Sequence, residues 1–123
     1  MIKSKAETFN DGLVQVFSIV NGAEAGDKPI ELLRRKCRLR YKERTVGMGR
    51  FYTALQAQAR IDRLLRCQRI EGVSTLDIAI PNDNAQYRIV QVQYPEDVVP
   101  PVMDLTLERL TVDYRIGGVE SGA

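Results

Sequence analysis

Positive charges occupy every second position between residues 34 and 44 of this 123-residue chain: Arg34, Lys36, Arg38, Arg40, Lys42 and Arg44. Successive side chains of a β-strand point to opposite faces of its sheet, so this spacing predicts an extended strand with all six charges on one face. The apolar residues Cys37, Leu39 and Tyr41 lie between the charges and would face the core. A helix would distribute the same charges around its axis. We therefore expect a strand with a strongly basic face.

Charge is unevenly distributed along the chain, although the net charge is only +2. Residues 34–69 contain twelve Lys or Arg and two acids, whereas the remainder contains six bases and fourteen acids. This asymmetry indicates a polyanionic partner or a neighbouring subunit of opposite charge. An equally good interpretation is an edge strand whose charges prevent aggregation.

The composition argues against an enzyme. The chain has no histidine, which excludes Ser-His-Asp and Cys-His catalysis and removes the commonest transition-metal ligand. The carboxylates Asp62, Asp77 and Asp104 do not have the spacing of a metal site, and no glycine-rich phosphate loop follows a strand. We expect no catalytic activity, no metal and no cofactor, with a metal-dependent nuclease as a minor alternative.

The two cysteines and the N-terminus indicate a chain made and kept in a cytoplasm. No apolar run is long enough to span a membrane, and the first residues, MIKSKAETFNDG, contain no apolar signal-peptide core. Cys37 and Cys67 are expected to be free thiols. The neighbouring Lys36 and Arg38 would lower the thiolate pKa of Cys37. Because no base is present to pair with it, we interpret Cys37 as a small core residue, and Cys67 likewise.

Hydrophobic periodicity predicts further strands at residues 13–20, 76–80, 87–94 and 103–108. Residues 48–59 repeat apolar side chains at three- and four-residue steps, which predicts a short helix with its aromatic rings in the core. Residues 60–70 fit a strand or a continuation of this helix, and we favour the strand. The alternation changes phase near Glu108 and Arg109, which predicts a bulge, or a separate strand that could reach a neighbouring subunit.

These elements predict a mainly β fold, a small β-barrel or rolled antiparallel sheet of five to six strands with one short α-helix. No internal repeat or composition break divides the chain, so we expect one domain over residues 1–123. Residues 21–33 would form a long loop, and residues 117–123 a flexible tail.

The segment at residues 49–58 carries a family resemblance. A glycine and a basic-aromatic group, Gly49, Arg50, Phe51 and Tyr52, precede the predicted helix, which continues through Leu55 and Gln56 in an Ala/Gln stretch. This block is similar to one found in the head-tail adaptor proteins of long-tailed bacteriophages, also called head-closure or stopper proteins. The turn at residues 72–75, the strand at 86–93 and the acidic loop at 95–97 are similar too. The resemblance covers about residues 9–110.

The resemblance implies a non-enzymatic structural protein of a phage or prophage virion. Many copies would form a ring at the virion neck after assembly in the host cytoplasm, closing the DNA-filled head and joining the portal and its adaptor to the tail. A loop would reach into the central channel and hold the packaged double-stranded DNA without reading its sequence. The basic residues of 34–44, with Arg50, would face either this DNA or the acid-rich surface of the next subunit. We favour the subunit boundary, because too strong a grip on DNA would hinder ejection.

A barrel of the oligonucleotide-binding type is the alternative function. Such a barrel would carry single-stranded nucleic acid over the basic strand face. Proteins of that kind usually stack bases on aromatic side chains beside the cations. Tyr41 is expected on the opposite face, which makes this alternative the weaker one.

Overall fold

The computed structural model describes residues 8–22, 30–45 and 60–117. These ranges are mainly β and contain seven strands: β1 (Gly12–Asn21), β2 (Glu31–Arg44), β3 (Arg63–Gln68), β4 (Ile78–Ile80), β5 (Tyr87–Gln93), β6 (Val102–Arg109) and β7 (Arg115–Ile116). No helix occurs within these ranges. The helix predicted at residues 48–59 lies outside the described residues.

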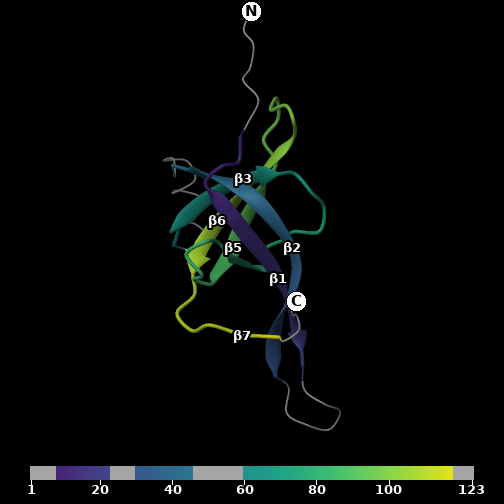
Figure 1. Cartoon of the computed structure of the whole chain (residues 1–123), viewed down its shortest axis with the longest axis vertical. Coiled ribbons are helices and arrows are strands. Elements are labelled where there is room, and N and C mark those ends of the chain that lie inside the picture. The colour runs from purple at the N-terminus through teal and green to yellow at the C-terminus, as the bar shows by residue number, and fades with distance from the viewer. Residues whose placement is uncertain (1–7, 23–29, 46–59, 118–123) are drawn as a thin grey trace, which may run out of the picture.

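Six of the strands pair in a closed ring. Their order is β1, β4, β5, β6, β3, β2 and back to β1, and every pair in the ring is antiparallel. The strands predicted at 13–20, 87–94 and 103–108 are confirmed, the one predicted at 76–80 is shorter, and residues 63–68 of the ambiguous segment form a strand. In Figure 1 the long β1–β2 hairpin extends beyond the other ring strands at the bottom of the molecule.

The interior of the ring holds the larger of two apolar clusters. Val14 and Val16 of β1 meet Tyr41 of β2 there, together with alternate residues of the remaining strands: Leu65, Cys67, Ala79, Tyr87, Ile89, Met103, Leu105 and Leu107. Each strand contributes every second side chain to this core, which is the period that the sequence analysis used. The alternation therefore identifies the inward residues wherever the strands are regular.

A second cluster lies on the outer side of β1, β2 and β4. It consists of Phe17, Leu33, Ile78 and Ile80, against which Ile19, Leu110 and Tyr114 pack. The chain leaves β6 at Arg109, crosses this cluster, and then forms β7, which pairs parallel with Leu32 and Leu33 of β2. The predicted change of phase is thus explained by a separate strand, which pairs here with β2 of the same chain.

Gln86 holds the crossing segment in place. Its side-chain amide donates to Tyr114 O at 2.9 Å and accepts from Tyr114 N at 2.8 Å. Its backbone carbonyl accepts from Leu110 N at 3.0 Å. Because Gln86 is only 5% exposed, these bonds satisfy a polar side chain that would otherwise be buried without partners.

The loop predicted at residues 21–33 is shorter in the structure. Pairing between β1 and β2 continues to Val20 with Leu32 and Asn21 with Glu31. Beyond the last pair, Gly22 N still donates to Ile30 O at 2.8 Å. Leu32 and Leu33 therefore belong to the hairpin. On the second edge of β2 they pair with β7.

Candidate functional site

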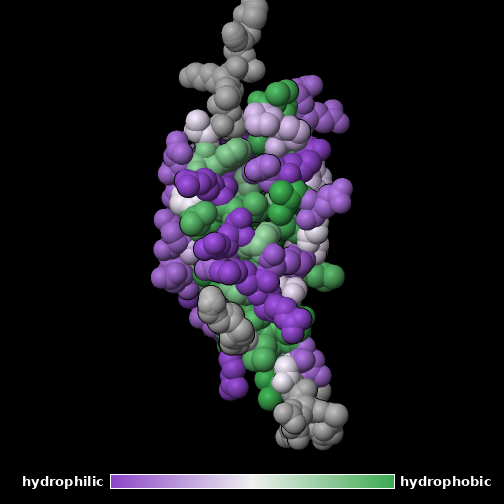
Figure 2. All heavy atoms as spheres, turned by 45° about the vertical axis from the view of Figure 1, so that its right-hand side comes forward, coloured by the Kyte–Doolittle hydropathy of each residue, from purple (hydrophilic) through white to green (hydrophobic). Residues whose placement is uncertain are grey.

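The basic segment is a strand, as predicted. Residues 34–44 lie within β2, and Cys37, Leu39 and Tyr41 pack into or against the core of the ring. Arg34, Lys36, Arg38 and Arg40 are exposed, whereas Lys42 and Arg44 are half-buried. In the space-filling view, strongly hydrophilic groups cross the middle of the molecule and continue toward the hairpin (Figure 2).

A β-bulge at Lys36 interrupts this strand. The adjacent β1 residues Val16 and Phe17 pair with Cys37 and Arg35, so Lys36 is an extra residue on β2. Val16 points into the ring and Phe17 into the outer cluster. Arg35 therefore shares the outer side with Phe17, whereas strict alternation with Cys37 and Leu39 would point it inward.

The bulge divides the six cations between two sides of the sheet. Arg34 pairs with Ser18, and Arg38 pairs with Gln15. Ser18 and Gln15 are three residues apart on a strand that is regular there, so they lie on opposite faces. The expectation that all six charges share one face is therefore wrong. Arg35, Arg38 and Arg40 share the outer face, and Arg34 lies on the other.

Lys36 is bound within the chain. Its Nζ lies 2.7 Å from Asp77 Oδ2 and 2.5 Å from the carbonyl oxygen of Gly72. Asp77 is 2% exposed and also accepts from Ser74 N at 2.9 Å. The bulge thus directs a lysine to a buried carboxylate in the connection between β3 and β4, where it neutralises a charge that would be costly alone.

Part of the remaining positive charge is also neutralised internally. Lys42, Arg66 and Asp104 are neighbours in register across β2, β3 and β6. Arg66 donates to Asp104 through Nε at 2.8 Å and Nη2 at 3.0 Å, and both side chains are less than 10% exposed. This buried pair joins a base from residues 34–69 to an acid from the rest of the chain.

A small group of arginines has no ion pair among the described residues. Within residues 8–22, 30–45 and 60–117, no carboxylate forms an ion pair with Arg34, Arg38, Arg40 or Arg44. Arg35 donates to Gln15 Oε1 at 3.2 Å, a neutral partner, and no carboxylate of the described residues forms an ion pair with it. The sequence pattern predicted most of this group but not Arg35, because only the bulge places that residue on the outer face.

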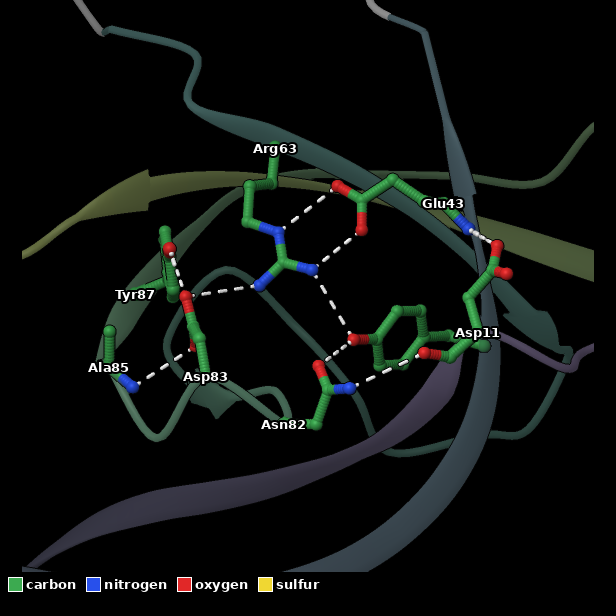
Figure 3. A network of polar contacts seen from close by, with 8 residues as sticks. Asp11, Glu43, Arg63, Asn82, Asp83, Ala85 and Tyr87 are labelled. Atoms are coloured by element: carbon green, nitrogen blue, oxygen red, sulfur yellow. Dashed lines mark hydrogen bonds and ion pairs between the residues drawn. The ribbon is translucent and has the colours of Figure 1, made fainter.

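A polar network that sequence analysis did not predict closes one end of the ring. Its centre is Arg63, the first residue of β3, whose guanidinium donates to Glu43 through Nε at 3.0 Å and Nη2 at 2.6 Å. Nη1 lies 3.2 Å from Asp83 Oδ2. The same guanidinium lies 5.7 Å from the ring centres of Tyr41 and Tyr87. Figure 3 shows these groups converging from β2, β3 and the turn after β4.

The network continues around the same end of the ring. Tyr41 Oη donates to Asn82 Oδ1, and Asn82 Nδ2 donates to the carbonyl oxygen of Asp11 at 3.4 Å. Asp11 Oδ2 accepts from Glu43 N at 2.7 Å. One signal in the sequence could have revealed this arrangement. Arg63 occupies the same inward phase as the buried residues Leu65 and Cys67, and an arginine at such a position requires acidic partners.

The network shifts the pKa values of its members. Its hydrogen bond to Glu43 raises the pKa of Arg63 above the ordinary value. Burial alone would raise the pKa of Asp83, but hydrogen bonds from Tyr87 and Ala85 and the charge of Arg63 lower it below 3.8. Burial and the hydrogen bond to Asp83 raise the pKa of Tyr87. The arrangement closes this end of the ring, with Arg63 paired to the carboxylates of Glu43 and Asp83.

Both cysteines are free thiols. Burial raises the pKa of Cys37 despite the opposing charge of Lys36, so the expectation of a lowered value is wrong. Burial raises the pKa of Cys67 to about 12. These shifts favour the interpretation of both residues as core side chains, since a nucleophile needs an accessible thiolate.

The family-motif residues Gly49, Arg50, Phe51, Tyr52, Leu55 and Gln56 lie outside the described residues. Among the residues that the structure does describe, no three His, Cys, Asp or Glu side chains gather as metal ligands. None of the described segments is a helix long and apolar enough to cross a membrane. The exposed arginines of β2 are therefore the candidate functional site.

No family model matches this chain, and no curated protein matches it. The function proposed below therefore rests on the sequence and on the strands, charges and contacts of the described residues.

Proposed function

We propose that this chain is a structural head-closure protein of a long-tailed phage or prophage. Copies of it form a homo-oligomeric ring at the virion neck, which closes the DNA-filled head and connects the portal and adaptor proteins above to the tail proteins below. In this proposal the six-stranded ring of the subunit is a small β-barrel that serves as a rigid, non-enzymatic body. The sequence block at residues 49–58 supports the family, and the fold supports a structural role.

The observation that carries the proposal is the set of unpaired arginines on β2. Four other cations of residues 34–69 have acidic partners within the chain: Lys36, Arg60, Arg63 and Arg66. Arg34, Arg38, Arg40 and Arg44 do not have one among the described residues. Like charges on one strand repel one another unless another molecule supplies the opposite charge. In a larger assembly a neighbouring subunit supplies the opposite charge, whereas an isolated monomer has no such neighbour.

The shape of the subunit fits a position around a channel. The β1–β2 hairpin projects beyond the other ring strands, and its last pair joins Asn21 to Glu31 (Figure 1). A projection of this kind can extend from a ring of subunits toward its central channel. DNA there would be held through its phosphates, so retention would weaken as salt rises. For the arginines themselves we favour a neighbouring polypeptide, because ejection requires DNA to leave.

Binding of single-stranded nucleic acid by an oligonucleotide-binding-type barrel is the second candidate. The closed ring of strands and the exposed arginines favour it. However, the side chains paired with Arg38 and Arg40 on β1 are Gln15 and Leu13, neither of which can stack on a base. Tyr41, the aromatic residue of β2, is 1% exposed. The described face thus lacks the aromatic platform that this mode uses.

Mass photometry of the purified chain and cryo-EM of assembled heads test the proposal. We expect rings of identical subunits, and density for this chain between the portal complex and the tail. A chain that stays monomeric at all concentrations and never joins a portal complex would contradict it. A salt-titrated binding assay separates the alternative, which requires tight binding to single strands without any portal partner.

A further inference from the structure

One edge of β2 is open along the basic stretch. Its first edge pairs with β1 over residues 31–41. On the second edge, β7 pairs as far as Leu33, and β3 begins to pair only at Tyr41. Between these two points no described strand pairs with β2. An unpaired edge of this length offers backbone donors and acceptors to another extended chain.

Arg35 and Arg38 direct their backbone groups to this open edge. Tyr41 O accepts from Asp11 N on the β1 side, and the direction of the backbone groups alternates along a strand. Leu39 and Cys37 therefore face β1, and Arg38 faces the open edge. From the other end, Leu33 O accepts from Gly117 N, so Arg35 also faces that edge. Arg35 and Arg38 are three positions apart and still face the same edge, because Lys36 is an extra residue between them.

The side chains of the same stretch supply charge on one side of this edge. Arg35, Arg38 and Arg40 lie on the outer face, and all three are exposed. On a strand added to the edge, the residues opposite Arg38 and Arg40 would be two positions apart and would point to the same outer face. Acidic residues at alternate positions of the added strand would meet both arginines.

We propose that the edge of β2 between Arg34 and Arg40 binds an extended acidic segment of a different protein by strand addition. Main-chain hydrogen bonds to the edge would provide affinity, and acids at alternate positions would provide specificity. This inference deepens the proposed head-closure function, on which it rests for its biological setting. The partner protein would contact the ring through an acidic segment of this kind.

The acids of the chain itself do not suit this role, because no two of them are two positions apart in the sequence. Glu96 and Asp97 are consecutive, so they would point to opposite faces of an added strand. Pro95, Pro100 and Pro101 flank them and lack the N–H groups that pairing requires. A second copy is therefore a poorer occupant than a partner with alternating acids.

NMR of the purified full-length chain with a synthetic probe tests the proposal. The probe is a capped eight-residue peptide of alternating Glu and Val. We expect binding to slow amide hydrogen exchange at Arg35 and Arg38, while exchange at Cys37 and Leu39, which face β1, stays unchanged. Two further peptides carry N-methyl groups, one on its odd-numbered and one on its even-numbered residues. The peptide whose methylated residues face β2 should bind at least about tenfold more weakly, because each methyl group removes a donor and blocks the approach of the backbone.

The double variant Arg38→Glu/Arg40→Glu should weaken binding of the probe about tenfold or more, since it replaces two attractive pairs with repulsive ones. Arg109→Glu is the matched control, an exposed arginine on β6 that should leave binding unchanged. Binding without amide protection, or equal binding of the N-methylated peptides, would overturn strand addition and leave a purely ionic surface. No binding would favour the interpretation of the arginines as guards against aggregation and would also overturn it.

The outcomes separate this inference from the head-closure proposal. Ring formation and position in the virion are measured without the peptide, and amide protection is measured without the virion. Rings without peptide binding would reject the docking edge alone. Peptide binding by a chain that never enters a neck would reject the head-closure function alone.

Discussion

Replacing Arg63 with methionine should destabilise the protein far more than removal of an exposed arginine. Arg63 forms two hydrogen bonds to Glu43 and an ion pair with Asp83, and its side chain is 18% exposed. Methionine keeps the apolar stem but removes every one of these contacts. Glu43 and Asp83 are both 42% exposed, so water can partly replace the lost partner.

The size of the effect follows from these contacts. The two hydrogen bonds to Glu43 together contribute roughly 1.5–3 kcal/mol, the range for one bond to a charged group, because water can partly replace them, and the partly exposed ion pair contributes up to about 1 kcal/mol. The two aromatic contacts add about 0.5–1 kcal/mol each. The side-chain entropy released on removing the contacts offsets about 1.5–2 kcal/mol. We expect a loss of about 2–3 kcal/mol in the free energy of unfolding, or about 10 °C in Tm for a domain of this size.

Chemical denaturation monitored by circular dichroism measures this loss. Arg88→Met is the matched control, because Arg88 pairs with Glu108 at 2.6 Å but is 47% exposed. Its loss should cost less than about 1 kcal/mol. Arg63→Lys should fall between the two, since lysine keeps the charge without the fork that binds Glu43. If Arg63→Met unfolds at the same denaturant concentration as Arg88→Met, the network does not stabilise the end of the ring.

Three further predictions concern polar side chains that have partners within the chain. Asp104→Ala should cost about 3–5 kcal/mol because it leaves Arg66 buried without its anion, and Arg66→Met/Asp104→Leu should recover most of this loss in the same denaturation assay; equal stabilities of the single and double variants would contradict the reasoning. The pKa of Asp83 is lower in the folded state than its ordinary value of 3.8, so the ionised carboxylate stabilises the fold at pH values above 3.8, and this stabilisation is lost as pH falls through the folded-state pKa. Asp83→Asn should therefore flatten the profile of stability against pH below about pH 4. A profile parallel to that of the unmodified protein would argue against this reasoning. Gln86→Ala should accelerate amide exchange at Tyr114 by breaking two hydrogen bonds while lowering Tm only slightly; unchanged exchange would show that the outer cluster alone holds this segment.

Sequence alternation predicted most of the strands but could not reveal the bulge at Lys36. The extra residue, Lys36, is itself one of the alternating cations, so the sequence is equally consistent with a regular strand and with a bulged one. The bulge depends on the pairing of β2 with β1 and on the buried carboxylate of Asp77. Both partners are distant in sequence, so local periodicity does not contain them.

The candidate site divides in the same way. The presence of a basic strand with Tyr41 turned inward follows from the two-residue period alone. The selection of Arg35, Arg38 and Arg40 as outward neighbours beside an open edge does not, because it depends on where β3 and β7 begin and end their pairing. The network around Arg63 likewise requires residues from β2, β3 and the turn after β4 to meet.

The sequence by itself determined that residues 34–44 form a strand with polar and apolar positions in alternation, because the direction of side chains along a strand is a local property of the backbone. Only the tertiary structure decided which cations are neutralised within the chain and which remain for a partner. That outcome depends on distances between carboxylates and guanidinium groups far apart in sequence, and folding alone sets those distances.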